Sequence, residues 1–448
     1  MVGYGFVYIA QVAAKVRFKW QAMQRAIITV SCVLLQCPDS ARYYISWSLY
    51  RSNNLSEENR MPIVNRYAQM HPQIVEWRRD FHTHPELLFE LERTAARVAE
   101  LLREFGCDEV VEGVGRTGVV GVIRGSSAAS GRVIGLRADM DALPIEEATG
   151  LDYASQAPGM MHACGHDGHT AMLLGAAKYL AETRNFNGTA VVVFQPAEEG
   201  GAGGLEMCRD GLMDRFGIQE IYGMHNMPGL PVGHFAIRPG ALLASSDEFE
   251  IVVTGKGGHA AEPHKSVDTT LVSAQILLAL QTIVSRNVDP LKRVVVTVGT
   301  FNTDSAASNV IAHEVRMQGT VRTLDPEYRK IAEQRVFEIA EGTAKAMGAS
   351  ASVTWERGYP VTVNTAENTQ YAAEVAEKVS ASVDDNVDPI MPAEDFSYML
   401  EERPGAYIFV GNGDSASCHH PAYNFDDDAI PYGCSWYSGM VESRMPSE

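Results

Sequence analysis

The sequence lacks an ordered set of cysteines and an excess of positive charge. Seven cysteines are scattered over 448 residues, and their number is odd. This pattern argues against a disulfide-rich secreted scaffold and makes a reducing cytoplasm the expected location. The net charge is −19, which argues against nucleic acid or an anionic membrane as a partner.

Several sequence motifs of common enzyme classes are also missing. There is no G-x-S-x-G elbow, no G-x-x-x-x-G-K-[ST] loop and no G-x-G-x-x-G after a predicted strand. These absences disfavour serine hydrolases, nucleotide hydrolases and dinucleotide-dependent oxidoreductases. No internal repeat or low-complexity tract is present either. The length of 448 residues, with 46% apolar and 21% charged residues, is typical of a soluble globular protein of two or three domains.

The first sixty residues differ from the rest of the chain. They carry a net charge of +4, against −23 for the remainder, and contain the apolar run Ala26–Leu35. This outline is similar to a signal peptide, but the run is short and no A-x-A site follows. Met61 opens directly onto a helical pattern. We therefore interpret residues 1–60 as an upstream extension outside the fold, with a cleaved or anchoring segment as the alternative.

Hydrophobic patterning predicts an α/β protein with an insertion. In 61–244 and again in 359–448, short apolar strands alternate with helices, which indicates a mostly parallel sheet with helices on its faces. Between 245 and 358 two helices and several alternating strands indicate a smaller α+β domain. The expected helices lie within 61–104 and at 167–183, 203–215, 267–286, 326–347, 366–380 and the C-terminus. The expected strands are 119–123, 133–136, 190–194, 248–253, 294–298, 315–321, 351–356 and 407–410.

A dense group of metal-binding side chains precedes the predicted helix 167–183. Three histidines and a thiol lie within eight residues: His162, Cys164, His166 and His169. Thiolate and imidazole are good ligands for zinc and similar metals. Gly165 allows the tight loop that would let Cys164 and His166 converge, and a helix N-terminus behind them would stabilise a thiolate. The alternative is a polar loop with incidental histidines.

Carboxylates follow two predicted strands. Asp139 and Asp141 come after one, where a loop carboxylate can orient a metal-bound imidazole; a helix cap or solvated turn is the alternative. Glu198 and Glu199 come after another. One of such a pair can bind metal while its neighbour acts as a general base on water. Glutamate pairs are usually solvated turns, but the Cys/His group upstream favours the functional interpretation.

Single histidines complete the set of candidates. They are His225, His259 and the pair His419 and His420, each within a Gly- or Pro-rich turn expected at the end of an element. A lone histidine is more often structural than a ligand, so these positions are weaker candidates. Together the residues offer thiolate, imidazole and carboxylate ligands with a spare glutamate, a combination suited to metal-assisted hydrolysis.

Six stretches carry a resemblance to a known family. They are RDFHTHPE (79–86), LRADMDALP (136–144), MHACGHD (161–167), QPAEEG (195–200), GGHAAEPH (257–264) and AEDF (393–396). In order and spacing they resemble the dinuclear metal aminoacylase and carboxypeptidase family, in the branch of hippurate hydrolases, auxin-conjugate amidohydrolases and N-acyl-amino-acid deacylases. The resemblance covers about 61–448.

The resemblance implies specific roles. Two metal ions per subunit, Zn or Mn with Co or Ni as alternatives, would be bound by Cys164, His166, Glu199, His225 and His419. Cys164 would bridge the two metals, His166 and His225 would complete one site, and Glu199 and His419 the other. Glu198 would be the general base and Asp141 would orient a ligand.

The resemblance also implies that the inserted, ferredoxin-like domain is a lid that dimerises. His259 would reach the scissile carbonyl of a neighbouring subunit, while Asn309 and Arg322 would hold the substrate carboxylate. Two departures from the family pattern stand out. Cys418 replaces the usual leucine before the late ligand, so His420 competes with His419, and Ala312 replaces a proline near Asn309.

The expected activity is hydrolysis of the amide bond of an N-acyl or N-aroyl amino acid, in a homodimer or higher homo-oligomer. Deacetylation of an N-acetyl biosynthetic intermediate or cleavage of a small dipeptide is the alternative with the same chemistry. A third hypothesis is a lapsed, non-catalytic metal-binding homologue. The presence of Glu198 beside a complete ligand set argues against this last hypothesis.

Overall fold

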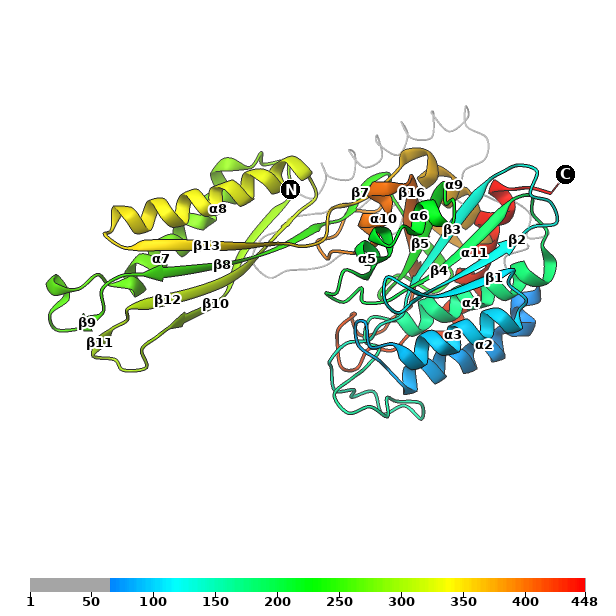
Figure 1. Cartoon of the computed structure of the whole chain (residues 1–448), viewed down its shortest axis with the longest axis horizontal. Helices are drawn as coiled ribbons and strands as arrows, with labels where there is room; N and C mark the ends of the chain where they lie inside the picture. Colours follow the sequence, from blue (N-terminus) through cyan, green and yellow to red (C-terminus); the bar gives the residue numbers. More distant parts are fainter. Residues whose placement is uncertain (1–64, 448) are drawn as a thin grey trace, which may run out of the picture. The chain divides into compact units, whose positions relative to one another are not determined.

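The structure is a computed structural model that describes residues 65–447; the interpretation of residues 1–60 lies outside this range. It contains one eight-stranded sheet, one four-stranded sheet and two short two-stranded ribbons. Figure 1 shows helices packed against both larger sheets. The α/β fold with a smaller α+β part is therefore confirmed.

The eight-stranded sheet has a parallel centre. Its strands, in spatial order, are β1 (Glu109–Val114), β2 (Gly118–Arg124), β4 (Thr189–Gln195), β3 (Val133–Asp139), β5 (Glu220–Met227), β16 (Gly405–Gly411), β6 (His234–Ala236) and β15 (Ser382–Asp384). β4, β3, β5 and β16 run parallel, while β2 joins β4 antiparallel. β16 follows the insertion and pairs with β5, which precedes it, so the two flanking segments share one sheet.

Helices bury both faces of this sheet. On β4, Val192 and Phe194 pack into one core, whereas Val191 and Val193 pack into the other. The first core is covered by α2 (Asn65–Thr83), α3 (Glu92–Glu104), α4 (His166–Thr183), α9 (Ala366–Val379) and α11 (Ile430–Arg444). The second is covered by α5 (Gly203–Arg209), α6 (Leu212–Arg215) and α10 (Phe396–Glu402). Burial on both faces explains why the strand sequences are continuously apolar.

The four-stranded sheet has the order β10 (Val294–Thr303), β12 (Glu314–Thr323), β8 (Ser245–Thr254) and β13 (Ser350–Arg357), all antiparallel. Its helices are α7 (Thr269–Thr282) and α8 (Pro326–Ala346), and both pack on one face. The chain order β-α-β-β-α-β is that of the ferredoxin-like arrangement. The ribbons are β9 (Gly258–His259) with β11 (Val310–Ile311), and β7 (Gly240–Leu243) with β14 (Thr362–Asn364).

Some local predictions were wrong. The helix expected over 203–215 is two helices, because Gly211 adopts a left-handed φ of 80° between them. The helix expected over 267–286 ends at Thr282 and continues as a π-helical turn, Ile283–Asn287. β5 was not expected, so His225 lies inside a strand instead of in a turn. Within the described residues, no helix combines the length and apolarity required to cross a bilayer.

Candidate metal centre

The candidate ligands gather where the parallel strands end. The carboxyl ends of parallel strands meet at one edge of a sheet, where ligands commonly bind. β3 leads into Asp141, β4 leads into Glu198 and Glu199, and His225 lies near the end of β5. The segment after β16 carries His419, whose backbone N–H donates to Ala163 O at 2.8 Å. Residues distant in sequence therefore converge beside the Cys164 loop.

Two groups of potential ligand atoms share one cysteine. Cys164, His166 and His225 form the first, and Cys164, Glu199 and His419 form the second; within each, the ligand atoms lie within 4.8 Å of one another. Cys164 Sγ is 3.4 Å from His225 Nε2, and Glu199 Oε1 is 3.3 Å from His419 Nε2. This arrangement matches the two ligand sets that the sequence resemblance implied.

The competing histidine is oriented differently. His420 Nδ1 accepts a hydrogen bond from Ala422 N at 3.0 Å, although His419 and His420 are both exposed. His420 belongs to none of the candidate ligand groups found in 65–447. His419 has a positive φ of 65°. This unusual backbone angle accompanies a side chain directed at Glu199, so the geometry favours His419 as the ligand.

Asp141 forms hydrogen bonds to the loops that carry the candidate ligands. Its Oδ1 accepts from Glu198 N at 2.8 Å and its Oδ2 from Glu199 N at 3.1 Å. His166 Nδ1 lies 2.8 Å from the Asp141 carbonyl oxygen, which leaves Nε2 free to face the cluster. Asp141 thus orients one imidazole and both glutamates, a broader role than the sequence suggested.

Glycine is required at position 165, between Cys164 and His166. Its φ is +92°, and a Cβ atom there would lie 2.4 Å from both Asn226 Nδ2 and Tyr423 Oη. Gly165 precedes the first residue of α4, His166. The close approach and the left-handed backbone together let the thiol and the imidazole face the same centre.

The buried side chains of this cluster fit a divalent cation. His166 Nε2 is buried and has no hydrogen-bond partner within the described part of the chain, and the buried Glu199 Oε1 has none apart from its 3.3 Å approach to His419 Nε2. Burial alone would lower the pKa of His166, but the carboxylates of Asp139 and Asp141 raise it to about 10. The same excess of negative charge would attract a metal cation, which would displace that proton on binding.

Glu198 is buried between the candidate ligands His166 and Glu199 on one side and two further carboxylates on the other. Its carboxylate lies within 4.8 Å of those of Glu394 and Asp395. Burial, followed by the charges of Glu394 and Glu199, raises the pKa of Glu198 well above its usual range. A carboxylate with raised proton affinity next to a metal-binding cluster has the properties of a general base.

Two buried polar networks behind the ligands escaped the sequence analysis. Arg137 on β3 is fully buried and donates to Asp139, Glu394 and Asp395. Asp139 lies 2.6 Å from His169 Nδ1, and Asn226 N donates to His169 Nε2. The available signal for Arg137 was a charged residue within an apolar strand. His169 belongs to the Cys/His group of the sequence, but its contacts reach Asp139 on β3 and Asn226 on β5 and have no local sequence signal.

The candidate substrate residues lie elsewhere. His259 and Asn309 are exposed and adjacent: Ala260 N donates to Asn309 O, and His259 pairs with Val310. Asn309 precedes β12, which begins at Glu314, whereas Arg322 lies near the end of β12 and pairs with Ser246. Glu314 to Arg322 spans about 26 Å of extended strand. Within one chain, therefore, His259 and Asn309 do not meet Arg322.

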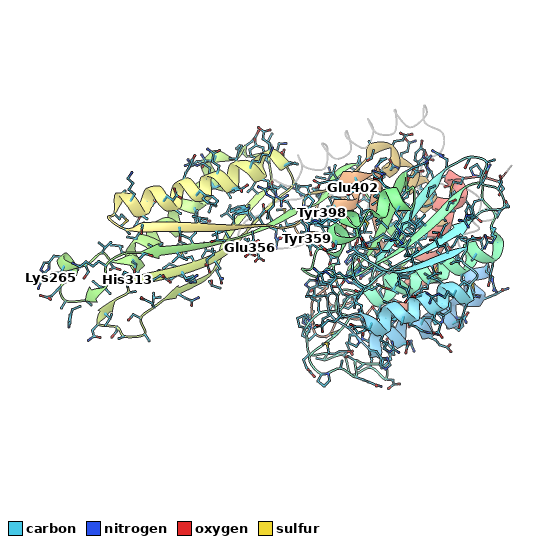
Figure 2. All side chains as sticks on the ribbon, in the orientation of Figure 1. Lys265, His313, Glu356, Tyr359, Tyr398 and Glu402 are labelled. Carbon is cyan, nitrogen blue, oxygen red and sulfur yellow. The ribbon has the colours of Figure 1, made fainter. Side chains whose placement is uncertain are left out.

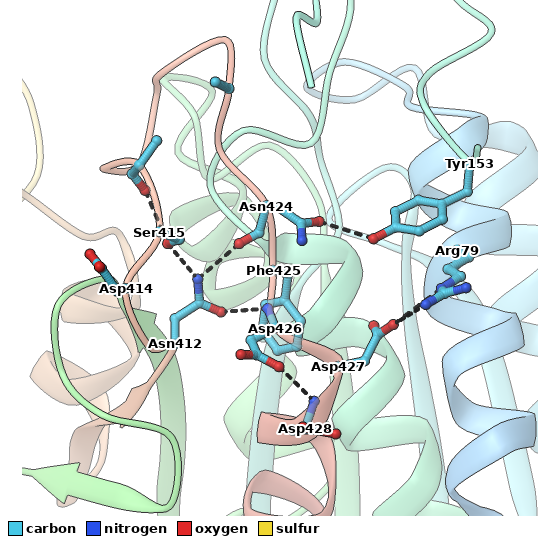
Figure 3. A pocket seen from close by; sticks show the side chains of 12 residues that line it. Arg79, Tyr153, Asn412, Asp414, Ser415, Asn424, Phe425, Asp426, Asp427 and Asp428 are labelled. Carbon is cyan, nitrogen blue, oxygen red and sulfur yellow. Dashed lines mark hydrogen bonds and ion pairs between the residues drawn. The ribbon is translucent and has the colours of Figure 1, made fainter. Parts of the chain in front are cut away.

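A cavity of about 550 Å³ adjoins the segment that carries His419. Figure 3 shows Asn412 at its wall, where Asn412 Nδ2 donates to Ser415 Oγ and Asn424 O, and Asn412 Oδ1 accepts from Asp426 N. Among residues 65–447, the cavity lining contains none of the candidate ligands. These bonds fix the base of the loop that presents His419.

Fold and site together define an α/β protein with a centre at which two groups of potential metal ligands share Cys164. Residues 135–443 match the model of Peptidase family M20/M25/M40. The chain belongs to this family.

Several known proteins are similar over nearly their whole length. Hippurate hydrolase of Campylobacter jejuni is 41% identical over 85% of this chain and 99% of its own. N-acetyl-L-cysteine deacetylase of Bacillus subtilis is 43% identical over 81% of this chain and 86% of its own. The Bacillus subtilis YXEP protein, a dinuclear metal binding peptidase, has a TM-score of 0.74 at 34% identity, covering 84% of this chain and 99% of that one.

Proposed function

We propose that this protein is a metal-dependent amidohydrolase that cleaves an N-acyl or N-aroyl amino acid into a carboxylic acid and a free amino acid. The observation that carries the proposal is the pair of ligand groups sharing Cys164, with the buried carboxylate of Glu198 beside them. The names of the relatives are consistent with this reaction.

The proposed roles follow from the chemistry of each side chain. Two bound divalent metals would lower the pKa of water and polarise the scissile carbonyl. Glu198 would accept the proton of the attacking water and return it to the leaving amine. Asp141 would hold Glu198 and Glu199 by their backbone amides. The Cys/His/Glu ligand set suits Zn or Mn, with Co and Ni as alternatives.

We further propose that residues 245–358 form a lid and dimerisation domain inserted between catalytic segments 61–244 and 359–448. Arg322 Nη1 is buried without a hydrogen-bond partner in 65–447, and such a group suits a substrate carboxylate. His259 and Asn309 would act in the site of a second subunit, since they do not meet Arg322 within one chain. Leu271 and Leu278 on α7 are 52% and 61% exposed and offer apolar contacts for a homodimer.

A substrate and metal panel tests the activity. The purified protein would be stripped of metal, reloaded with Zn, Mn, Co or Ni, and assayed with N-acetyl, N-benzoyl and indole-acetyl amino acids. Hydrolysis of one series is expected, with Glu198→Gln as the inactive control. Absence of hydrolysis throughout would reject the proposal in favour of a lapsed metal-binding homologue.

Deacetylation of an N-acetyl amino acid is a second candidate, because relatives with both types of name are similar to a nearly equal degree. Cleavage of a small dipeptide would use the same chemistry. The same panel, extended by dipeptides, separates these reactions by the ratio of kcat/KM for N-acetyl, N-benzoyl and dipeptide substrates. The five cysteines of the described residues are free thiols, in keeping with the cytoplasmic location that we expect.

Metal binding has its own test. Cys164→Ala should lose bound metal by elemental analysis, because it removes a ligand from both groups. Cys208→Ala is the matched control, since Cys208 is a buried free thiol on α5. Equal metal content in the two variants would contradict the shared-ligand role.

A further inference from the structure

The loop that carries Glu198 and Glu199 has an unusual backbone. It connects β4 to α5, and Ala197 and Ala202 adopt positive φ angles of 52° and 54°. Residues with a Cβ atom rarely adopt positive φ angles, because the Cβ atom then lies too close to a backbone carbonyl oxygen. Such a loop keeps its shape only when surrounding contacts hold it.

One side chain from outside the loop supplies three of these contacts. The hydroxyl of Tyr359 donates to Glu198 O at 2.5 Å and accepts from Gly200 N at 2.9 Å and Ala202 N at 3.3 Å. Its capacity as donor and acceptor is therefore used entirely on the loop. The bond to Glu198 O acts on the residue whose carboxylate is the proposed general base.

The backbone of Tyr359 belongs to a different part of the molecule. It lies two residues after β13, which ends at Arg357, and its carbonyl oxygen accepts from Ser246 N on β8 at 2.9 Å. The preceding Gly358 donates to Asp247 Oδ1 at 3.1 Å. Tyr359 thus follows β13 in the chain and is hydrogen-bonded to β8, the two strands that connect the four-stranded sheet to the rest of the chain.

Side chains of two helices contact this junction, which consists of the start of β8 and residues 358–359 after β13. Arg329 of α8 donates to both oxygens of Asp247 and to Gly358 O. Tyr398 of α10 donates to Gly358 O at 3.2 Å, and its ring stands edge-on to that of Tyr359. Figure 2 shows Tyr359 and Tyr398 next to each other. A rotation of the strands at this junction would therefore move the Tyr359 hydroxyl and the loop bonded to it.

We propose that Tyr359 is a positioning residue that holds the general-base loop and couples its position to the junction of the four-stranded sheet. The proposal rests on the amidohydrolase function proposed above, in which Glu198 is the base. Tyr359 acts through the main chain of Glu198, so its removal affects turnover more than binding of metal or substrate.

The test compares two phenylalanine variants. Tyr359→Phe removes three bonds to the loop, whereas Tyr398→Phe removes one bond at the same junction that goes to Gly358 O. We expect kcat of Tyr359→Phe to fall about 10–100-fold, because small misplacements of catalytic groups have effects of this size. KM and metal content should stay near wild type. Tyr398→Phe should keep kcat within about twofold. Equal kcat for the two variants, or a change confined to KM, would overturn the proposal.

Hydrogen exchange provides a second measurement that is independent of activity. The backbone amides of Gly200 and Ala202 should exchange faster in Tyr359→Phe, by about tenfold or more at Ala202. Ala202 N loses its acceptor, whereas Gly200 N keeps its bond to Glu198 O. Exchange of both amides should be unchanged in Tyr398→Phe, and protection elsewhere shows that both variants fold. Unchanged exchange in Tyr359→Phe would reject the positioning role. A wild-type protein without amidase activity would instead reject the proposed function, while the exchange result still decides whether Tyr359 holds the loop.

Discussion

The regions around the eight-stranded and four-stranded sheets differ in how far their candidate functional side chains are exposed to solvent. Around the eight-stranded sheet most of these side chains are buried: Arg137 and His166 are inaccessible and Glu198 nearly so, whereas the His419 side chain is 53% exposed. Around the four-stranded sheet, His259 and Asn309 are exposed. The difference separates a largely buried group of candidate metal ligands from exposed candidate substrate contacts, for which we propose a role with a second subunit.

The burial patterns of the strands explain this difference. β4 is buried on both faces, so its polar residues, Thr189 and Gln195, are its first and last residues. β8 alternates between buried and accessible positions because helices cover only one face of its sheet. Four predictions test how far the contrast between the two regions extends.

The largest expected effect concerns stability. Arg137→Met would leave the buried carboxylates of Asp139, Glu394 and Asp395 without their counter-ion, and we expect a loss of about 3–5 kcal/mol in the free energy of unfolding. Arg316→Met is the control, because Arg316 pairs with Glu250 on the exposed face of the four-stranded sheet. That surface pair should contribute about 0.2–1 kcal/mol. Urea denaturation measures the free energy of unfolding of both variants. Similar losses in the two variants would contradict the contrast between the two sheets.

The second prediction concerns turnover. Glu198→Gln keeps the size of the side chain but removes its ability to accept a proton, so kcat should fall by about two decades or more. Elemental analysis should find unchanged metal content. Glu206→Gln on α5 serves as the control, because Glu206 forms a surface ion pair with Arg209. Near-normal turnover in Glu198→Gln would remove the base assignment.

The third prediction separates two adjacent histidines. His419→Ala should weaken binding of one metal by about tenfold or more, since its ring nitrogen faces Glu199. His420→Ala should leave metal binding unchanged, because its ring bonds Ala422 N. Titration of the metal-free variants with Zn or Mn provides the dissociation constants. A larger loss in His420→Ala would assign the ligand to that residue instead.

The smallest effect is expected from the four-stranded sheet. Arg322→Gln should raise KM for an N-acyl amino acid about tenfold with little change in kcat, because it weakens a charge-assisted bond made equally in ground and transition states. An N-acyl amine without the carboxylate serves as the control substrate and should show no difference. A fall in kcat with constant KM would mean that Arg322 acts in turnover.

The reliability of the sequence predictions depended on how local the signal was. β2, β3, β4 and β16 are continuous apolar runs, and all four were predicted close to their observed bounds. β5 was missed because its sequence, Glu220–Met227, mixes polar and apolar residues with no regular period. Its polar positions are stabilised by partners on other elements: Glu220 accepts from Asn368 of α9, and Asn226 donates to Cys164 O.

The sequence by itself determined which chemical groups are available and which of them share a loop. Cys164 and His166 face one centre because Gly165 lies between them, and Glu198 and Glu199 share a turn after β4. The tertiary structure decided which distant residues join them, because the register of parallel strands brings Asp141, His225 and His419 to one edge. It also revealed the contact of the Tyr359 hydroxyl with the Glu198 loop. Side-chain contacts between elements far apart in sequence depend on packing and have no local pattern to reveal them.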